Sequence, residues 1–105
     1  MMKSITVTEL KEMFDNKEDF QLIDVREEAE YENANINGTL IPLGEIPTRY
    51  NEISKDKKVI IQCRSGVRSA NALNYLEQNL GYTNLYNLEG GIIAWAREID
   101  HSIEV

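Results

Sequence analysis

The segment Val59-Ile60-Ile61-Gln62-Cys63-Arg64-Ser65-Gly66-Val67-Arg68-Ser69 joins a short apolar run to a polar loop. The apolar residues that follow recur at helical spacings of three and four: Ala70, Leu73, Leu76 and Leu80. The pattern therefore predicts a strand, a tight loop and a helix, with the helix over residues 67–79. The free N–H groups and partial positive charge of a helix N-terminus stabilise a thiolate or a bound anion. This pattern predicts an activated sulfur nucleophile inside an anion-binding loop.

Strand-like and helix-like segments alternate along the rest of the chain. Strands are predicted at residues 4–7, 20–25, 36–43, 59–62 and 84–88. Between them, helices are predicted after an N-cap at Thr8, over 27–33, over 45–53 with Pro47 in the first turn, over 67–79 and from residue 92 onward. This alternation predicts an α/β fold, with a central, mainly parallel sheet and helices on both faces. Because reactive groups in such folds gather at the carboxyl ends of strands, the position of Cys63 fits a catalytic residue.

The composition narrows the possible functions. A chain of 105 residues predicts one domain over residues 1–105, and its formal net charge of −7 argues against nucleic-acid and anionic-membrane partners. The single cysteine excludes an internal disulfide, and with only one histidine, His101, no metal site is expected. The chain contains no run of about 20 apolar residues, so no membrane-spanning helix is expected. The first residues do not resemble a signal peptide. A free thiol indicates a reducing compartment, so a cytoplasmic location is expected.

Three motifs, in order along the chain, resemble those of single-domain rhodaneses, a family of sulfurtransferases. Leu22-Ile23-Asp24-Val25-Arg26, followed by Glu30-Tyr31, is similar to the N-terminal motif. Residues 63–69 are similar to the active-site loop, with glycine at its fourth place and arginine at its sixth. Residues 90–95 are similar to the C-terminal motif. The chain departs from the family pattern at Asn35-Ile36-Asn37-Gly38-Thr39, where family members often carry a histidine. We interpret the loss of that histidine as a structural difference that does not affect the chemistry of the loop.

The resemblance implies a rhodanese-like fold and a persulfide cycle that needs no metal or organic cofactor. The Cys63 thiolate would attack a small anionic sulfur donor such as thiosulfate and pass the sulfur to cyanide, to a thiol or to a partner protein. The expected substrate-binding residues are those of the loop, with the two guanidinium groups attracting the anion: Arg64, Ser65, Gly66, Val67, Arg68 and Ser69. Asp24 and Arg26 are expected to support the loop structurally. Arg68, nearer the helix start, is expected to point into the loop, and Arg64 to point outward.

Two alternatives remain open at this stage. Cysteine phosphatases also place a cysteine loop at a helix N-terminus, but their loop is one residue longer than the four residues between Cys63 and Arg68. A shorter loop forms a smaller cradle, which suits a terminal sulfur better than a phosphoryl group. The second alternative is a non-enzymatic persulfide carrier or binding module in a sulfur relay. An intact nucleophile argues against an inert module but is compatible with a relay.

Overall fold

The computed structural model describes residues 2–105 and contains a five-stranded sheet in the order β1-β5-β4-β2-β3. Every neighbouring pair of strands is parallel. The strands are β1 (Ser4–Ile5), β2 (Phe20–Asp24), β3 (Thr39–Leu40), β4 (Lys58–Gln62) and β5 (Leu85–Leu88). The predicted α/β class with a parallel sheet is thus confirmed, and the strand that precedes Cys63 lies at the centre of the sheet.

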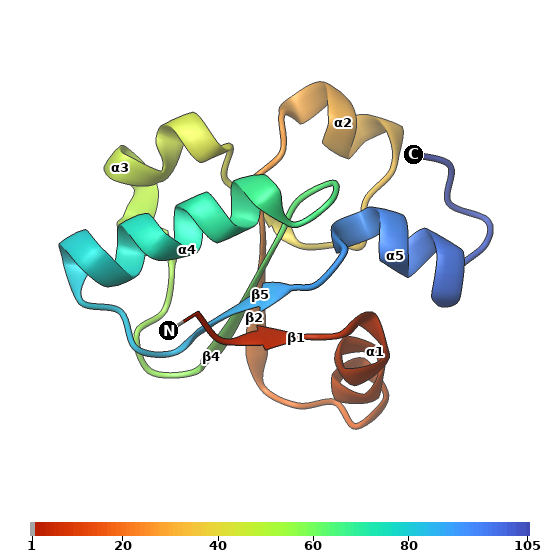
Figure 1. Ribbon diagram of the computed structural model, residues 1–105, viewed down its shortest axis with the longest axis horizontal. Helices are drawn as coiled ribbons and strands as arrows, with labels where there is room; N and C mark the ends of the chain where they lie inside the picture. The colour runs from red at the N-terminus through yellow and green to blue at the C-terminus, as the bar shows by residue number, and fades with distance from the viewer. Residues whose placement is uncertain (1) are drawn as a thin grey trace.

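Helices cover both faces of the sheet, as the alternating pattern predicts (Figure 1). The α-helices are α1 (Val7–Asp15), α2 (Glu28–Asn33), α3 (Ile46–Arg49), α4 (Val67–Leu80) and α5 (Gly91–Glu98), and two 3-10 turns, η1 (Leu43–Glu45) and η2 (Tyr50–Glu52), flank α3. The side chains of α3 and α4 bury one face, and those of α1 and α5 bury the other. Within the described residues, no helix is long and apolar enough to cross a membrane.

The alternation of side chains along β4 sets the position of the thiol. Val59, Ile61 and Cys63 face the core under α4, whereas Ile60 faces the core under α1 and α5. Central parallel strands bury both faces, which explains the near-continuous apolar run of this segment. The chain leaves the carboxyl end of β4 with the sulfur already turned toward the N-terminus of α4.

The first helix begins two residues earlier than the sequence pattern predicts. Thr6, not Thr8, is the N-cap, and its hydroxyl accepts a hydrogen bond from the Glu9 N–H at 3.1 Å. The Glu9 carboxylate in turn accepts one from the Thr6 N–H at 2.9 Å. This reciprocal capping box ends β1 at Ile5 and places Val7, predicted as strand, in the first turn of α1.

Candidate active site

The loop between β4 and α4 turns sharply at Gly66, whose φ of 108° is a left-handed conformation that favours glycine. Gly66 is also the N-cap of α4, and its carbonyl accepts the first helical hydrogen bond from the Ala70 N–H at 3.2 Å. The helix can therefore begin at Val67, and its first turn lies next to the thiol. Backbone N–H groups of the first helical turn, which have no helical partner of their own, are left to point at the loop.

The sulfur of Cys63 is the point on which the loop converges. The Gly66 N–H donates to Sγ at 3.1 Å and the Ser69 N–H donates at 3.3 Å. The Ser69 hydroxyl also lies 3.3 Å from Sγ. Cys63 is only 1% exposed, so the surrounding residues cover its sulfur almost completely. The structure therefore brings Cys63, Gly66 and Ser69 together as the sequence predicts.

These contacts act on the acidity of the thiol. Burial raises the pKa of Cys63, but hydrogen bonds from the Ser69 hydroxyl and from the backbone N–H groups of Ser69, Gly66 and Ser65 lower it. The hydrogen bonds outweigh the burial, so the pKa lies below its ordinary value. At a given pH, the thiolate, which is the reactive form of cysteine, is consequently more populated at Cys63 than in an ordinary thiol.

Alkylation of Cys63 by iodoacetamide tests this balance. The rate rises with pH as the thiolate forms, and its midpoint is expected below the value of about 8.5 for a free thiol. Ser69→Ala removes the hydroxyl but keeps the N–H group, and loss of the hydroxyl hydrogen bond to the sulfur is expected to raise the midpoint. Thr48→Ala removes an exposed hydroxyl that donates only to the Glu45 carbonyl, so it is the control. Equal midpoints in the wild type and Ser69→Ala would contradict the assignment.

Backbone N–H groups at the N-terminus of α5 hold the start of the cysteine loop in place. The Ile92 N–H donates to the Cys63 carbonyl at 2.9 Å, and the Ile93 N–H donates to the Arg64 carbonyl at 3.1 Å. Gly91 permits this approach because a Cβ at that position would lie well inside 3.0 Å of both carbonyl oxygens. This glycine belongs to the motif at residues 90–95, but the sequence pattern gives it no role of its own. A glycine pair before an apolar helix is the only sequence signal for it.

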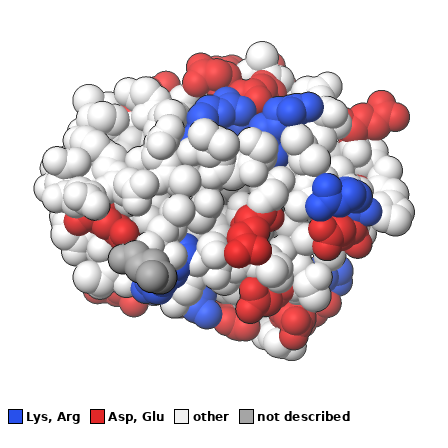
Figure 2. Space-filling model, in the orientation of Figure 1, with Lys and Arg blue, Asp and Glu red and all other residues white. Residues whose placement is uncertain are grey.

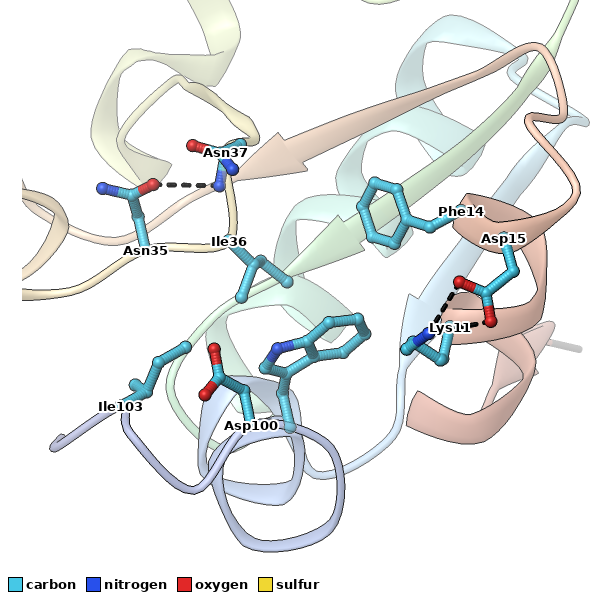
Figure 3. Close-up of a pocket in the computed structure, with 9 residues that line it drawn as sticks. Lys11, Phe14, Asp15, Asn35, Ile36, Asn37, Asp100 and Ile103 are labelled. Carbon is cyan, nitrogen blue, oxygen red and sulfur yellow. Dashed lines mark hydrogen bonds and ion pairs between the residues drawn. The ribbon is translucent and has the colours of Figure 1, made fainter.

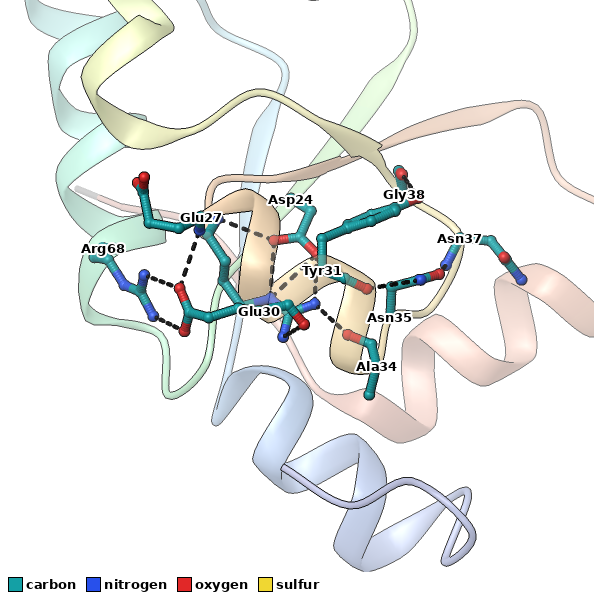
Figure 4. Close-up of polar contacts among 10 residues, drawn as sticks. Asp24, Glu27, Glu30, Tyr31, Ala34, Asn35, Asn37, Gly38 and Arg68 are labelled. Carbon is teal, nitrogen blue, oxygen red and sulfur yellow. Dashed lines mark hydrogen bonds and ion pairs between the residues drawn. The ribbon is translucent and has the colours of Figure 1, made fainter.

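The two loop arginines differ in their surroundings. Arg64 is exposed and enters none of the side-chain hydrogen bonds or ion pairs found among residues 2–105. Arg68 instead donates through both terminal nitrogens to the carboxylate of Glu30 on α2, at 2.7 and 2.9 Å (Figure 4). The guanidinium of Arg68 is thus bound to α2 and does not point freely into the loop, contrary to our expectation.

Asp24 and Arg26 form a buried ion pair at the end of β2. The Arg26 Nη2 lies 2.9 Å from the Asp24 Oδ2, and the two side chains are 2% and 0% exposed. Arg26 also donates to the carbonyls of Ala34, at 2.7 Å, and of Glu30, at 3.5 Å. The pair therefore fixes α2, and α2 in turn presents Glu30 to Arg68. The side chains of Asp24 and Arg26 thus contact α2 and not the cysteine loop, and any support that they give to the loop would pass through this helix.

Residues 35–39, which depart from the family pattern, are held by hydrogen bonds of the Asn35 side-chain amide. The Asn35 Nδ2 donates to the Tyr31 carbonyl at 3.0 Å, and its Oδ1 accepts from the Asn37 N–H at 2.9 Å. The segment lines one wall of a pocket of about 300 Å³, opposite Phe14 on α1 (Figure 3). Cys63 and the rest of its loop are not among the lining residues, so this pocket is separate from the thiol.

Charges of both signs meet beside the loop. Figure 2 shows basic atoms gathered against acidic atoms where α2 and the loop end of α4 lie in Figure 1. A small pocket of about 80 Å³ lies in this region, and its walls include Arg26, Glu30 and Arg64. Because the chain as a whole carries a formal net charge of −7, attraction of an anion depends on these local guanidinium groups.

Comparison with known proteins agrees with this geometry. The chain matches the family described as Rhodanese-like domain over residues 6–98. It is 45% identical over 98 residues to a protein of Allochromatium vinosum named Sulfurtransferase, covering 92% of this chain and 91% of that one. It is 39% identical over 98 residues to the putative sulfurtransferase YtwF of Bacillus subtilis, covering 92% and 93%.

Solved structures show the same fold. The crystal structure of a rhodanese-like domain protein from Staphylococcus aureus superposes with a TM-score of 0.84 at 39% identity, covering 99% of this chain and 98% of that one. The same family is indicated by the order of the three motifs, by the parallel sheet, by the cysteine loop and by the similarity to known proteins. The chain therefore belongs to the rhodanese-like domain family.

Proposed function

We propose that this protein is a sulfurtransferase that moves a sulfane sulfur from a donor such as thiosulfate to a thiophilic acceptor through a persulfide on Cys63. The observation that carries the proposal is the convergence of the Gly66 and Ser69 N–H groups on the Cys63 sulfur. Family membership and the sulfurtransferase names of similar proteins support it. A thiol nucleophile of this kind works in a reducing compartment, and we infer the cytoplasm.

The first half-reaction transfers one sulfur atom to the protein. The Cys63 thiolate attacks the outer sulfur of thiosulfate, a new S–S bond forms, and the old S–S bond breaks so that sulfite leaves with its electron pair. Arg64, the exposed residue that directly follows Cys63 in the chain, would attract the anionic donor. The terminal sulfur of the persulfide would lie among the loop N–H groups of residues 64–69, which stabilise negative charge on it.

The second half-reaction returns the thiolate. Cyanide attacks the terminal sulfur of the Cys63 persulfide, a C–S bond forms, the S–S bond breaks, and thiocyanate leaves. A thiol acceptor would react in the same way, as its thiolate, to become a persulfide itself. The single cysteine of the chain means that the persulfide has no internal thiol with which to form a disulfide.

Intact mass measurement tests both steps. Incubation with thiosulfate is expected to add one sulfur atom to the wild-type protein, and cyanide is expected to remove it with formation of thiocyanate. Absence of both events would contradict the proposed function. Loading without release to cyanide or to a small thiol would instead favour the persulfide-carrier alternative, in which a partner protein receives the sulfur.

The same preparation separates sulfur transfer from phosphatase chemistry. The four residues between Cys63 and Arg68 form a cradle too small for a phosphoryl group, so aryl phosphates are not expected to be hydrolysed. Gln62, directly before the nucleophile, is completely buried and offers neither an acid nor a base to a leaving group. Efficient hydrolysis through Cys63 without thiocyanate formation would contradict the sulfurtransferase assignment.

A further inference from the structure

The ion pair between Glu30 and Arg68 joins α2 to the first turn of α4, beside the nucleophile. Its two hydrogen bonds, of 2.7 and 2.9 Å, use both carboxylate oxygens and both terminal nitrogens. Each side chain is 32% exposed, so the pair is partly shielded from water. The hydrogen bond with Arg68 lowers the pKa of Glu30 to about 2, so the carboxylate is charged throughout the neutral range. The ion pair is therefore present throughout the neutral pH range.

Glu30 is itself held in place from three directions. Its Oε1 accepts a second hydrogen bond, from the Glu27 N–H at 3.0 Å, which completes the capping box of α2. Its backbone carbonyl faces the buried Arg26, and the same guanidinium donates to Ala34 at the end of the helix. A carboxylate anchored in this way holds Arg68 at α2 and offsets its positive charge, and the two donors that face Glu30 cannot turn to a second anion without breaking the pair.

The positive charge offered to a donor is consequently smaller than the sequence suggests. Arg68 is neutralised by Glu30, and Arg26 is neutralised by Asp24. Among the described residues of the loop and the neighbouring small pocket, Arg64 is the guanidinium left without an acidic partner. A dianion such as thiosulfate thus meets one unpaired cation, in a protein whose formal net charge is −7.

We propose that Glu30 is a specificity-determining residue that withholds Arg68 from the donor and so lowers the preference of Cys63 for dianionic donors relative to singly charged persulfides. This inference rests on the proposed function. With a persulfide donor, the Cys63 thiolate attacks the terminal sulfur, one S–S bond forms, the donor S–S bond breaks, and the donor thiolate leaves with the electron pair. Less negative charge approaches the loop in this reaction than with thiosulfate.

The test compares Glu30→Gln with Glu28→Gln. Both variants remove one acidic charge from α2, but Glu28 is exposed and forms no side-chain hydrogen bond or ion pair within residues 2–105. The donors are thiosulfate and 2-hydroxyethyl persulfide, and the measured quantity is kcat/KM for sulfur loading. Glu30→Gln is expected to raise the value for thiosulfate by about tenfold and to change that for the persulfide by less than about twofold. Glu28→Gln is expected to leave the ratio of the two unchanged.

The double variant Glu30→Gln/Arg68→Gln removes both members of the pair and keeps the net charge. If the pair is electrostatically silent in the wild type, the thiosulfate-to-persulfide ratio is expected to stay within about twofold of the wild-type ratio. A tenfold loss with thiosulfate in the double variant, or a loss with thiosulfate in Glu30→Gln, would show that Arg68 already binds the donor and would overturn the proposal. Equal changes with both donors would assign Glu30 a purely structural role and would overturn it as well.

Alkylation separates failure of this inference from failure of the proposed function. Iodoacetate is anionic and iodoacetamide is neutral, and both modify the Cys63 thiolate without any sulfur transfer. Glu30→Gln is expected to raise the ratio of the iodoacetate rate to the iodoacetamide rate by about tenfold. If the wild type takes up no sulfur while this ratio rises, the charge effect stands and the sulfurtransferase function fails. If sulfur is taken up and neither ratio changes in Glu30→Gln, only the role of Glu30 fails.

Discussion

Serine in place of Cys63 is expected to abolish sulfur uptake from every donor, with a loss of roughly 10⁴-fold or more in kcat/KM. The loop N–H groups that stabilise a thiolate cannot bring the far weaker acidity of a hydroxyl into the neutral range. The substituted side chain is nearly isosteric and 1% exposed in the native protein, so the fold is expected to persist. Intact mass after incubation with thiosulfate, together with thiocyanate formation, measures the loss.

A relocated thiol provides the control for this experiment. The double variant Cys63→Ser/Ser102→Cys keeps one cysteine in the chain but places it at an exposed position in the turn that follows α5, outside residues 63–69. Its thiol lacks the loop N–H donors and would lie beside the Asp100 carboxylate, which accepts a hydrogen bond from the Ser102 hydroxyl at 2.6 Å. Its pKa is therefore not expected to be lowered, and catalytic thiocyanate formation is not expected to return. Recovery of wild-type rates in this variant would mean that the loop contributes nothing, which contradicts the proposed mechanism.

Gly91→Ala is expected to have the second largest effect, although residue 91 does not touch the sulfur. The new Cβ would collide with the carbonyl oxygens of Cys63 and Arg64, which are backbone atoms and can escape only by moving the loop. The φ of 56° at this position adds strain of about 1–3 kcal/mol for a non-glycine residue. A shift of about 1 Å in the loop would cost roughly 100-fold in kcat/KM for sulfur transfer.

Gly81→Ala is the matched control, because Gly81 has a comparable φ of 70° but a Cβ added there would meet no atom within 4 Å. It ends α4 far along the chain from the loop, so it carries the backbone strain without the collision. Both variants are expected to lose stability in denaturant unfolding, and only Gly91→Ala is expected to lose most of its activity. If the two variants retained equal kcat/KM, α5 would not position the loop.

Local sequence patterns predict most of the fold correctly. The apolar run before Cys63, the helical spacing after it and the terminal Gly81 give strand β4 and helix α4 nearly to the residue, because each signal lies within a few positions of its effect. The cap of α1 is the instructive error. Thr6 and Glu9 have the spacing of a capping box, a local signal that outweighs the short alternating pattern through Val7.

The expected nucleophile and the hydrogen bonds to its sulfur likewise follow from residues that are neighbours in the sequence. Cys63, Gly66 and Ser69 lie within seven consecutive positions, so a strand–loop–helix pattern is enough to bring the N–H groups onto the sulfur. The parallel sheet also follows from alternation of strands and helices along the chain. For the same reason, the sequence predicts an anion-binding loop whose size disfavours a phosphoryl group.

What only the tertiary structure decides is which distant residues restrain that loop. Glu30 and Arg68 are 38 positions apart, and the helix that carries Gly91 reaches the Cys63 carbonyl only because β5 lies beside β4 in the sheet order. Periodicity and capping describe an element and its ends, whereas such contacts depend on how whole elements are placed against one another. The sequence alone therefore predicts a thiolate nucleophile in a loop at the N-terminus of a helix. The packing of α2 pairs Glu30 with Arg68, and the packing of α5 fixes the carbonyls of Cys63 and Arg64.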